Sequence, residues 1–147
     1  MNAKKDIFET VDEISKLYDK KVSEAVKDPL FRQKSTRLVM RYLYENGEMT
    51  QSDLTERTHM QKSTVSESLS KLEKVGYIAK FSNDYDLRSV KISITKKGSA
   101  VYENLKKVTD DAREELLHGI SPKDTATLEY VLDILNAKLN KNTKNKV

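Results

Sequence analysis

The sequence predicts a mainly α-helical protein with one small β-hairpin, an α+β fold, and two observations support this prediction. Apolar residues recur every three or four positions through most of the 147 residues, which is the period of amphipathic helices. The exception is a short segment in which Val90, Ile92 and Ile94 alternate with polar residues, as they do in a strand with one buried face. Helices are therefore expected on both sides of a single hairpin.

Two helices are expected before the central region. The first, about residues 6–27, has apolar residues at helical spacing, and Pro29 marks its end. The second, about residues 34–46, stops at Asn46 and Gly47, a pair that favours a helix terminus.

The central region predicts two further helices separated by a short turn. Thr50 is a good N-cap for a helix over residues 50–58, and Asp53, three positions later, completes a capping box. After a turn at residues 59–61, Val65, Leu69, Leu72 and Val75 line one face of a helix over residues 63–75, and Gly76 suits its C-terminal cap. The pattern is that of a helix-turn-helix.

The opposite face of the second of these helices is the candidate contact surface for nucleic acid. Its residues are polar and mostly small, which lets a backbone approach the major groove and lets hydroxyl groups bond to phosphates or base edges. Serine-rich faces are also common as ordinary solvated surface. The candidate residues are Lys62, Ser63, Thr64, Ser66, Glu67, Ser68 and Lys71.

A hairpin is expected directly after this helix. Residues 77–81 follow Gly76 as a first strand, residues 82–86 are rich in turn formers, and the alternating segment is the second strand. Asp86 and Arg88 are expected at its tip, where a charge-assisted hydrogen bond from the guanidinium would hold Arg88 in place. Alone, this segment suits an ordinary surface hairpin equally well. After a helix-turn-helix, it predicts a wing that enters the minor groove.

The order of elements and two motifs resemble the MarR family of bacterial transcriptional regulators. One motif is Asp86-x-Arg88 followed by Ile94-Thr95-x-x-Gly98, and the other runs from Ser63-Thr64-Val65-Ser66 to Gly76-Tyr77-Ile78. The resemblance implies a winged helix-turn-helix, a homodimer formed by the terminal helices, and an arginine of the wing in the minor groove. Glu67 departs from the pattern, because an acidic side chain repels phosphate.

Two more helices are expected after the hairpin. Thr95 is a suitable N-cap for a long helix that ends near Gly119, and Ser121 with Pro122 starts another. The tail is rich in lysine and asparagine and is expected to be disordered. The predicted organisation is a dimerisation helix in 1–30, a winged helix-turn-helix in 31–96, dimerisation helices in 97–140 and a disordered tail in 141–147.

The apolar stripes of the terminal helices need a partner surface. A second copy of the chain would cover them and would place two reading helices on a palindromic site, whereas folding back as a bundle within one chain is the alternative. Hydrophobic residues make up only 37% of the sequence, which suits a chain that completes its core by association.

Composition argues against several other classes of function. With no cysteine, disulfides and thiolate metal sites are excluded, and no apolar run reaches the length of a membrane span, so a cytoplasmic protein is expected. His59 and His118 lack the spacing of metal ligands or of a catalytic triad, and only four glycines are present, without a phosphate-binding loop. We expect no enzyme, no metal and no cofactor.

Two readings of function remain. The first is a dimeric, sequence-specific DNA-binding regulator, a repressor, and the net charge of +4 agrees with modest non-specific attraction to DNA. The alternative is a winged helix used for protein contact, with Glu67 weakening its affinity for DNA. The family resemblance further implies a small-molecule effector, often an aromatic or phenolic acid. The residues suggested for its cleft are Tyr18, Arg37, Arg41, Tyr42 and Tyr44.

Overall fold

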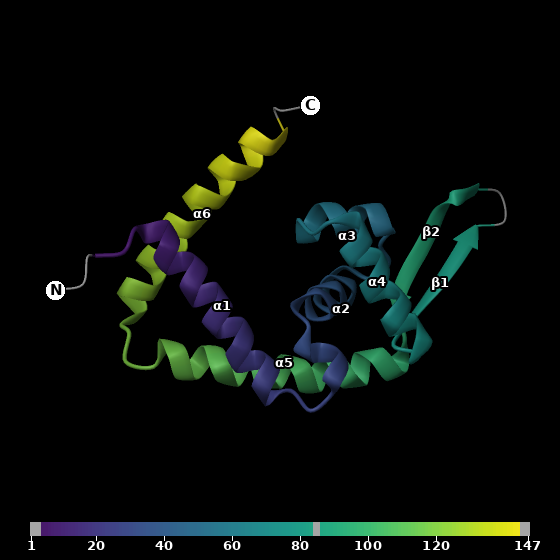
Figure 1. The fold of residues 1–147 in the computed structure, drawn as a ribbon, viewed down its shortest axis with the longest axis horizontal. Coiled ribbons are helices and arrows are strands. Elements are labelled where there is room, and N and C mark those ends of the chain that lie inside the picture. Colours follow the sequence, from purple (N-terminus) through teal and green to yellow (C-terminus); the bar gives the residue numbers. More distant parts are fainter. Residues whose placement is uncertain (1–3, 84–85, 145–147) are drawn as a thin grey trace. The chain divides into compact units, whose positions relative to one another are not determined.

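The computed structural model describes residues 4–83 and 86–144, and at residues 83, 86–89 and 142–144 it describes the backbone alone. Seven elements precede the long C-terminal helices in the order α1, η1, α2, α3, α4, β1, β2 (Figure 1). Their bounds are α1 Ile7–Ala25, η1 Pro29–Arg32, α2 Lys34–Asn46, α3 Gln51–Thr58, α4 Lys62–Lys74, β1 Ile78–Asn83 and β2 Asp86–Ile94, followed by α5 Lys96–Leu117 and α6 Pro122–Lys144. The mainly helical fold with one hairpin is confirmed.

The chain divides into two compact units, Met1–Ala112 and Arg113–Val147. The first unit contains one hydrophobic core, formed by the end of α1, η1, α2, α3, α4, the hairpin and the first turns of α5. At the centre of this core are side chains with no exposed surface: Val39, Met40, Leu43, Leu54, Val65, Leu69 and Leu72.

The helix-turn-helix forms as predicted, because its ends are determined locally. The Thr50 hydroxyl accepts from the Asp53 backbone N–H at 3.0 Å, and the Asp53 carboxylate accepts from the Thr50 backbone N–H at 3.1 Å. The backbone N–H of Thr50, and after it the Thr50 side chain, stabilise the ionised carboxylate by hydrogen bonding and so lower the pKa of Asp53. His59 ends α3 in the left-handed region, with φ 58°, and this sharp turn leads into α4.

The hairpin is antiparallel and pairs Ile78 with Ile94 and Lys80 with Ile92, with an irregularity in register between Phe81 and Asn83. Met49 adds a short bridge to Ile92, through two backbone hydrogen bonds of 3.0 and 2.8 Å. Ile92 is buried, as the alternating pattern predicted.

The second strand begins earlier than the sequence suggested. It starts at Asp86, so the backbone of Arg88 lies inside β2 and not in the tip of the hairpin. Asn83 pairs with Asp86, which leaves only residues 84 and 85 between the strands, and these two lie outside the described residues. The composition of residues 82–86 predicted a longer turn. Backbone hydrogen bonds to the partner strand outweigh such weak local preferences and extend β2 to Asp86.

The start of α5 is joined tightly to the end of α4. Thr95 caps α5, since its hydroxyl accepts from the Gly98 N–H at 3.0 Å and donates to the Gly76 carbonyl at 2.6 Å. A Cβ at Gly98 would lie 2.0 Å from the Tyr77 carbonyl oxygen, so this close packing requires glycine.

The second unit contains the end of α5, a turn at Gly119 and α6. Ser121 caps α6 by accepting from the Asp124 N–H at 3.1 Å, as predicted. α6 continues to Lys144, four residues into the tail that was expected to be disordered. Lysine is a good helix former, and an Asn140–Asn136 side-chain hydrogen bond of 3.0 Å one turn apart adds support near the end.

Candidate nucleic-acid interface

The outward face of α4 is the candidate interface. Val65, Leu69 and Leu72 anchor the helix on the core, where α4 contacts α2, α3 and β1. This orientation leaves a continuous polar face on the outside. Its exposed residues are Lys62, Ser63, Ser66, Glu67 and Ser70, and Thr64 lies at its margin, half-buried.

One predicted contact residue is not on this face. Ser68 is buried, with 2% of its surface exposed, and therefore cannot reach DNA without a change in the helix. Its position explains the error: Ser68 follows Val65 by three residues and precedes Leu72 by four, so it shares the buried side of the helix with them. Residue type suggested a contact, but the helical period places the side chain inside.

Lys71 and Glu67 form a pair on the outward face. The Lys71 ammonium lies 3.2 Å from Glu67 Oε1 and also donates to Gln33 Oε1 at 3.2 Å. Lys71 thus connects α4 to the residue that precedes α2, and its side chain is more enclosed than that of Glu67. The positive charge of Lys71, which was predicted to contact DNA, is therefore partly balanced by the carboxylate of Glu67.

A hollow beside the start of α4 adds residues that the sequence analysis did not select. It has a volume of about 520 Å³, with Lys62 on one side and the polar face of α3 on the other. The α3 residues that line it are Gln51, Ser52, Thr55 and Glu56. The spacing of these four polar residues could have indicated them, because positions four residues apart share one face of a helix.

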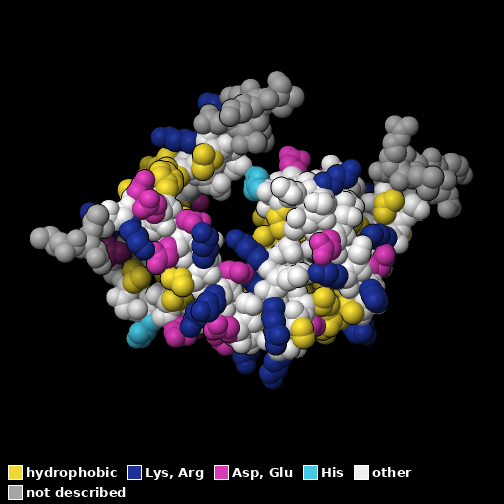
Figure 2. Space-filling view, viewed as in Figure 1, with side chains coloured by type: hydrophobic (Ala, Val, Ile, Leu, Met, Phe, Trp, Pro, Cys, Tyr) yellow, Lys and Arg dark blue, Asp and Glu magenta, His cyan; other side chains and the backbone are white. Residues whose placement is uncertain are grey.

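The hairpin contributes exposed basic residues on both strands. Lys80 of β1 and Lys91 of β2 are exposed, and Lys80 lies 3.9 Å from Glu73 of α4. In Figure 2 basic side chains, with acidic ones among them, lie over α4 and the neighbouring hairpin. The side chains of Asp86 and Arg88 lie outside the described residues, so their predicted hydrogen bond stays a prediction.

Both arginines suggested for an effector cleft have partners of their own. Arg37 forms an ion pair with Asp19 and donates to the Phe31 carbonyl at 2.8 Å, so it ties α2 to α1 and η1. Arg41 pairs with Glu45 at 3.2 Å. Among the described residues, Tyr18 is distinctive, because its buried hydroxyl has no hydrogen-bond partner there.

The two tyrosines of α2 that were suggested for the effector cleft, Tyr42 and Tyr44, also pack against other side chains. Arg57 lies over the ring of Tyr42, 5.4 Å from its centre, and Tyr44 packs against Tyr102 with ring centres 4.6 Å apart. A separate cavity of about 540 Å³ lies between the end of α1, η1 and α5. The residues that line it in the described part of the chain include none of the five suggested ones.

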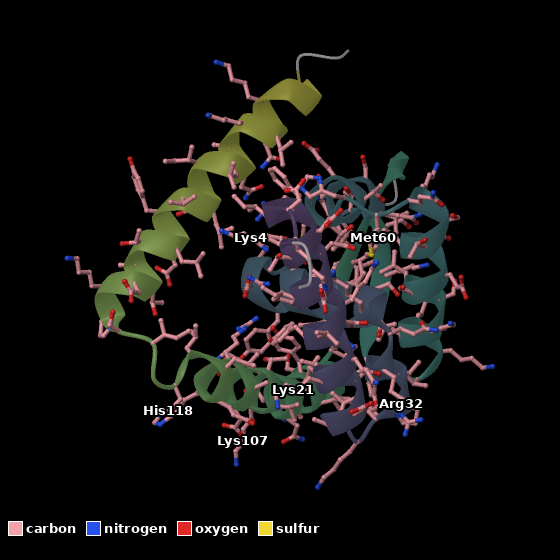
Figure 3. The ribbon with its side chains drawn as sticks, turned by 60° about the vertical axis from the view of Figure 1, so that its left-hand side comes forward. Lys4, Lys21, Arg32, Met60, Lys107 and His118 are labelled. Carbon is pink, nitrogen blue, oxygen red and sulfur yellow. The ribbon has the colours of Figure 1, made fainter. Side chains whose placement is uncertain are left out.

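The two histidines occupy helix ends. His59 is exposed at the end of α3, next to Met60, and His118 directly follows α5 (Figure 3). Within residues 4–83 and 86–144, no three His, Asp or Glu side chains form a group that could hold a metal ion. In the same residues, no helix is both long and apolar enough to cross a membrane.

Comparisons with known proteins agree with this geometry. Residues 36–90 match the model of the MarR family. The chain is 28% identical over 90 residues to YybA, an uncharacterised HTH-type transcriptional regulator of Bacillus subtilis (strain 168). That match covers 61% of this chain, and it spans only 60% of the length of YybA.

Two solved structures share the fold. An uncharacterised SlyA-like transcription regulator from Listeria monocytogenes superposes with a TM-score of 0.84 at 20% identity, over 95% of this chain and 92% of the other. BpsR of Bordetella bronchiseptica, whose DNA binding is regulated by 6-hydroxynicotinic acid, gives 0.79 at 16% identity, over 88% and 98%. The resemblance seen in the motifs is confirmed, since residues 36–90 match the MarR family model and the two solved structures share the fold.

Proposed function

We propose that the protein is a dimeric, sequence-specific DNA-binding repressor that reads a palindromic operator. The observation that carries the proposal is the outward face of α4, where Lys62, Ser63 and Ser66 are exposed at the start of a helix anchored on the core by buried side chains. Small hydroxyl residues at the N-terminal end of such a helix allow close approach to base edges. The wing would lie in the adjacent minor groove.

The dimer is proposed from exposed apolar side chains on the terminal helices. α1 exposes Ile7, which is 71% accessible, together with Phe8 and Ile14, and α6 exposes Leu128 and Val131. Hydrophobic side chains are visible on the surface over α6 in Figure 2. Apolar rows of this extent are typical of surfaces that bind a partner, and a second copy of the chain also supplies the second reading helix.

The first test measures DNA binding directly. Selection from random duplexes should enrich an inverted repeat whose half-sites are about one helical turn apart. Fluorescence anisotropy with the enriched duplex should then show affinity that falls steeply between about 50 and 200 mM salt. The absence of both enrichment and binding at low salt would instead favour the protein-contact function.

Lysine variants refine this test. Lys62→Ala and Lys71→Ala should weaken binding to all sequences alike and reduce the salt dependence by about one unit each, because each removes one phosphate contact. Lys106→Ala, on α5 and paired there with Asp110 at 3.3 Å, is a matched control that should bind as the parent does.

We propose further that a small aromatic acid relieves repression, by analogy with the regulation of BpsR. The support within this chain is the buried Tyr18 hydroxyl, which would accept or donate a hydrogen bond if a polar ligand reached it. Hydroxylated aromatic acids, 6-hydroxynicotinic acid first, should be added to the anisotropy assay, and a compound that releases DNA should do so less well with Tyr18→Phe. Because its target is the chromosome, such a regulator would act in the cytoplasm.

A further inference from the structure

Glu67 is placed where a base-reading side chain should be. It lies on the outward face of α4, and 70% of its side chain is exposed. Three of its neighbours on that face are small, Ser63 and Ser66 on the N-terminal side and Ser70 on the C-terminal side, and Lys71 one turn later is long. Glu67 therefore projects further than the serines around it, at the middle of the surface that would meet the major groove.

Its carboxylate is held in a defined way. Lys71 contacts Oε1 at 3.2 Å, and Lys71 is itself bonded to Gln33 at 3.2 Å, so the ion pair is tied to a second element of the fold. A carboxylate has two oxygen atoms and accepts several hydrogen bonds, so this contact leaves acceptor capacity on an exposed side chain. An exposed ion pair of this kind stabilises a helix only weakly, so helix stability explains little of why an acidic residue stands at this position.

The chemistry of a carboxylate restricts what it can bind on DNA. It only accepts hydrogen bonds, and phosphates repel it. Among groups on the major-groove edges, only the N4 amino group of cytosine and the N6 amino group of adenine donate. Adenine also presents the N7 acceptor beside its amino group, which disfavours a second carboxylate oxygen.

We infer that Glu67 is a specificity-determining residue that accepts a hydrogen bond from the N4 amino group of one cytosine in each half-site. This inference rests on the proposed DNA-binding function. The inference explains why an acidic residue, which weakens the general attraction to DNA, stands on this face: Glu67 would discriminate between base pairs. Thymine at the same position presents the O4 acceptor in place of a donor and is rejected by repulsion.

The test is a specificity swap in the full-length protein. Random duplexes are selected with the parent, with Glu67→Gln and with Glu67→Ala. The parent should enrich cytosine at one position of each half-site, Glu67→Gln should shift that position to adenine, because glutamine pairs with N6 and N7, and Glu67→Ala should lose the preference there alone. In competition titrations, a cytosine-to-thymine change at that position should cost the parent about tenfold in affinity and Glu67→Ala almost nothing.

Glu73→Gln is the matched control, since it removes the same charge from the same helix at a residue that pairs with Lys80. It should select the parent's sequence unchanged. A parental motif that both Glu67 variants also select, base for base, would overturn the role of Glu67 and leave the proposed function standing. If the parent enriches no motif, the proposed function itself fails, and the inference fails with it.

Discussion

At the scale of the residue, His59 adopts an unusual backbone conformation. It adopts φ 58° at the turn between α3 and α4, a region in which a side chain costs about 1–2 kcal/mol and glycine does not. His59→Gly should therefore stabilise the protein by about 0.5–1 kcal/mol, measured as a rise in the melting temperature by circular dichroism. His59→Ala keeps the strained backbone and is the control; it should be no more stable than the parent. Equal melting temperatures for all three would show that the turn is not strained.

Arg88 is a second prediction at this scale. Its backbone lies in β2, close to the end of the hairpin, and an arginine there would insert into the minor groove. Arg88→Ala should leave dimer and melting temperature unchanged, reduce DNA affinity, and lower the slope of log affinity against log salt by about one unit. Asp86→Ala should give a milder defect. Parent-like DNA binding by Arg88→Ala would remove the wing from recognition.

At the scale of elements, the contact between Gly98 and Tyr77 sets how α5 meets the winged module. An added Cβ would approach the Tyr77 carbonyl oxygen to 2.0 Å and Ile94 Cγ1 to 2.9 Å, and neither atom is at the end of a flexible side chain. Gly98→Ala should cost about 2–3 kcal/mol of unfolding free energy, by denaturant titration. Ser99→Ala, one residue later in the same turn, should cost much less. A fully stable Gly98→Ala protein would mean that α5 can shift without loss.

The same junction contains a hydrogen bond that predicts a dependence on pH. The Tyr77 hydroxyl donates to the Asp28 carboxylate at 2.5 Å, and this bond, with some burial, raises the pKa of Tyr77 to about 12. A raised pKa in the folded state means that the stabilisation is complete below pH 10 and disappears as the pH rises toward 12. Tyr77→Phe should lose about 1 kcal/mol at neutral pH, and that difference from the parent should vanish by about pH 12.

Absorbance at 295 nm follows the ionisation of tyrosine and checks this directly. In the parent Tyr77 should ionise late, and this late phase should be absent from both Tyr77→Phe and Asp28→Asn. A late tyrosine that persists in Tyr77→Phe would assign the raised pKa to a different residue.

At the scale of the whole molecule, the terminal helices should hold two chains together. Val131 is exposed on α6 together with Leu128 and Leu132, and burying a carboxylate among such residues without a partner is costly. Val131→Glu should raise the dissociation constant of the dimer at least about tenfold in sedimentation equilibrium, and Glu129→Gln should not. Deletion of residues 121–147 should give aggregated or unfolded protein. A folded, soluble monomer from that deletion would contradict the proposed dimer.

Local signals in the sequence were sufficient for the starts of α3, α5 and α6. Thr50 with Asp53, Thr95 and Ser121 each satisfy N–H groups within three residues, so their effect depends on nothing distant. The predicted helix over residues 34–46 agrees with α2 for the same reason, since Gly47, with φ 77°, ends it. The outward face of α4 followed from its period, with the exception of Ser68.

Tertiary contacts decided the remainder. The early start of β2 depends on pairing with β1, and the Asp28–Tyr77 and Lys71–Gln33 bonds join residues 49 and 38 positions apart. Such contacts depend on the free energy of a packed core and on partners that become neighbours only when the chain folds, so no local pattern in the sequence contains them.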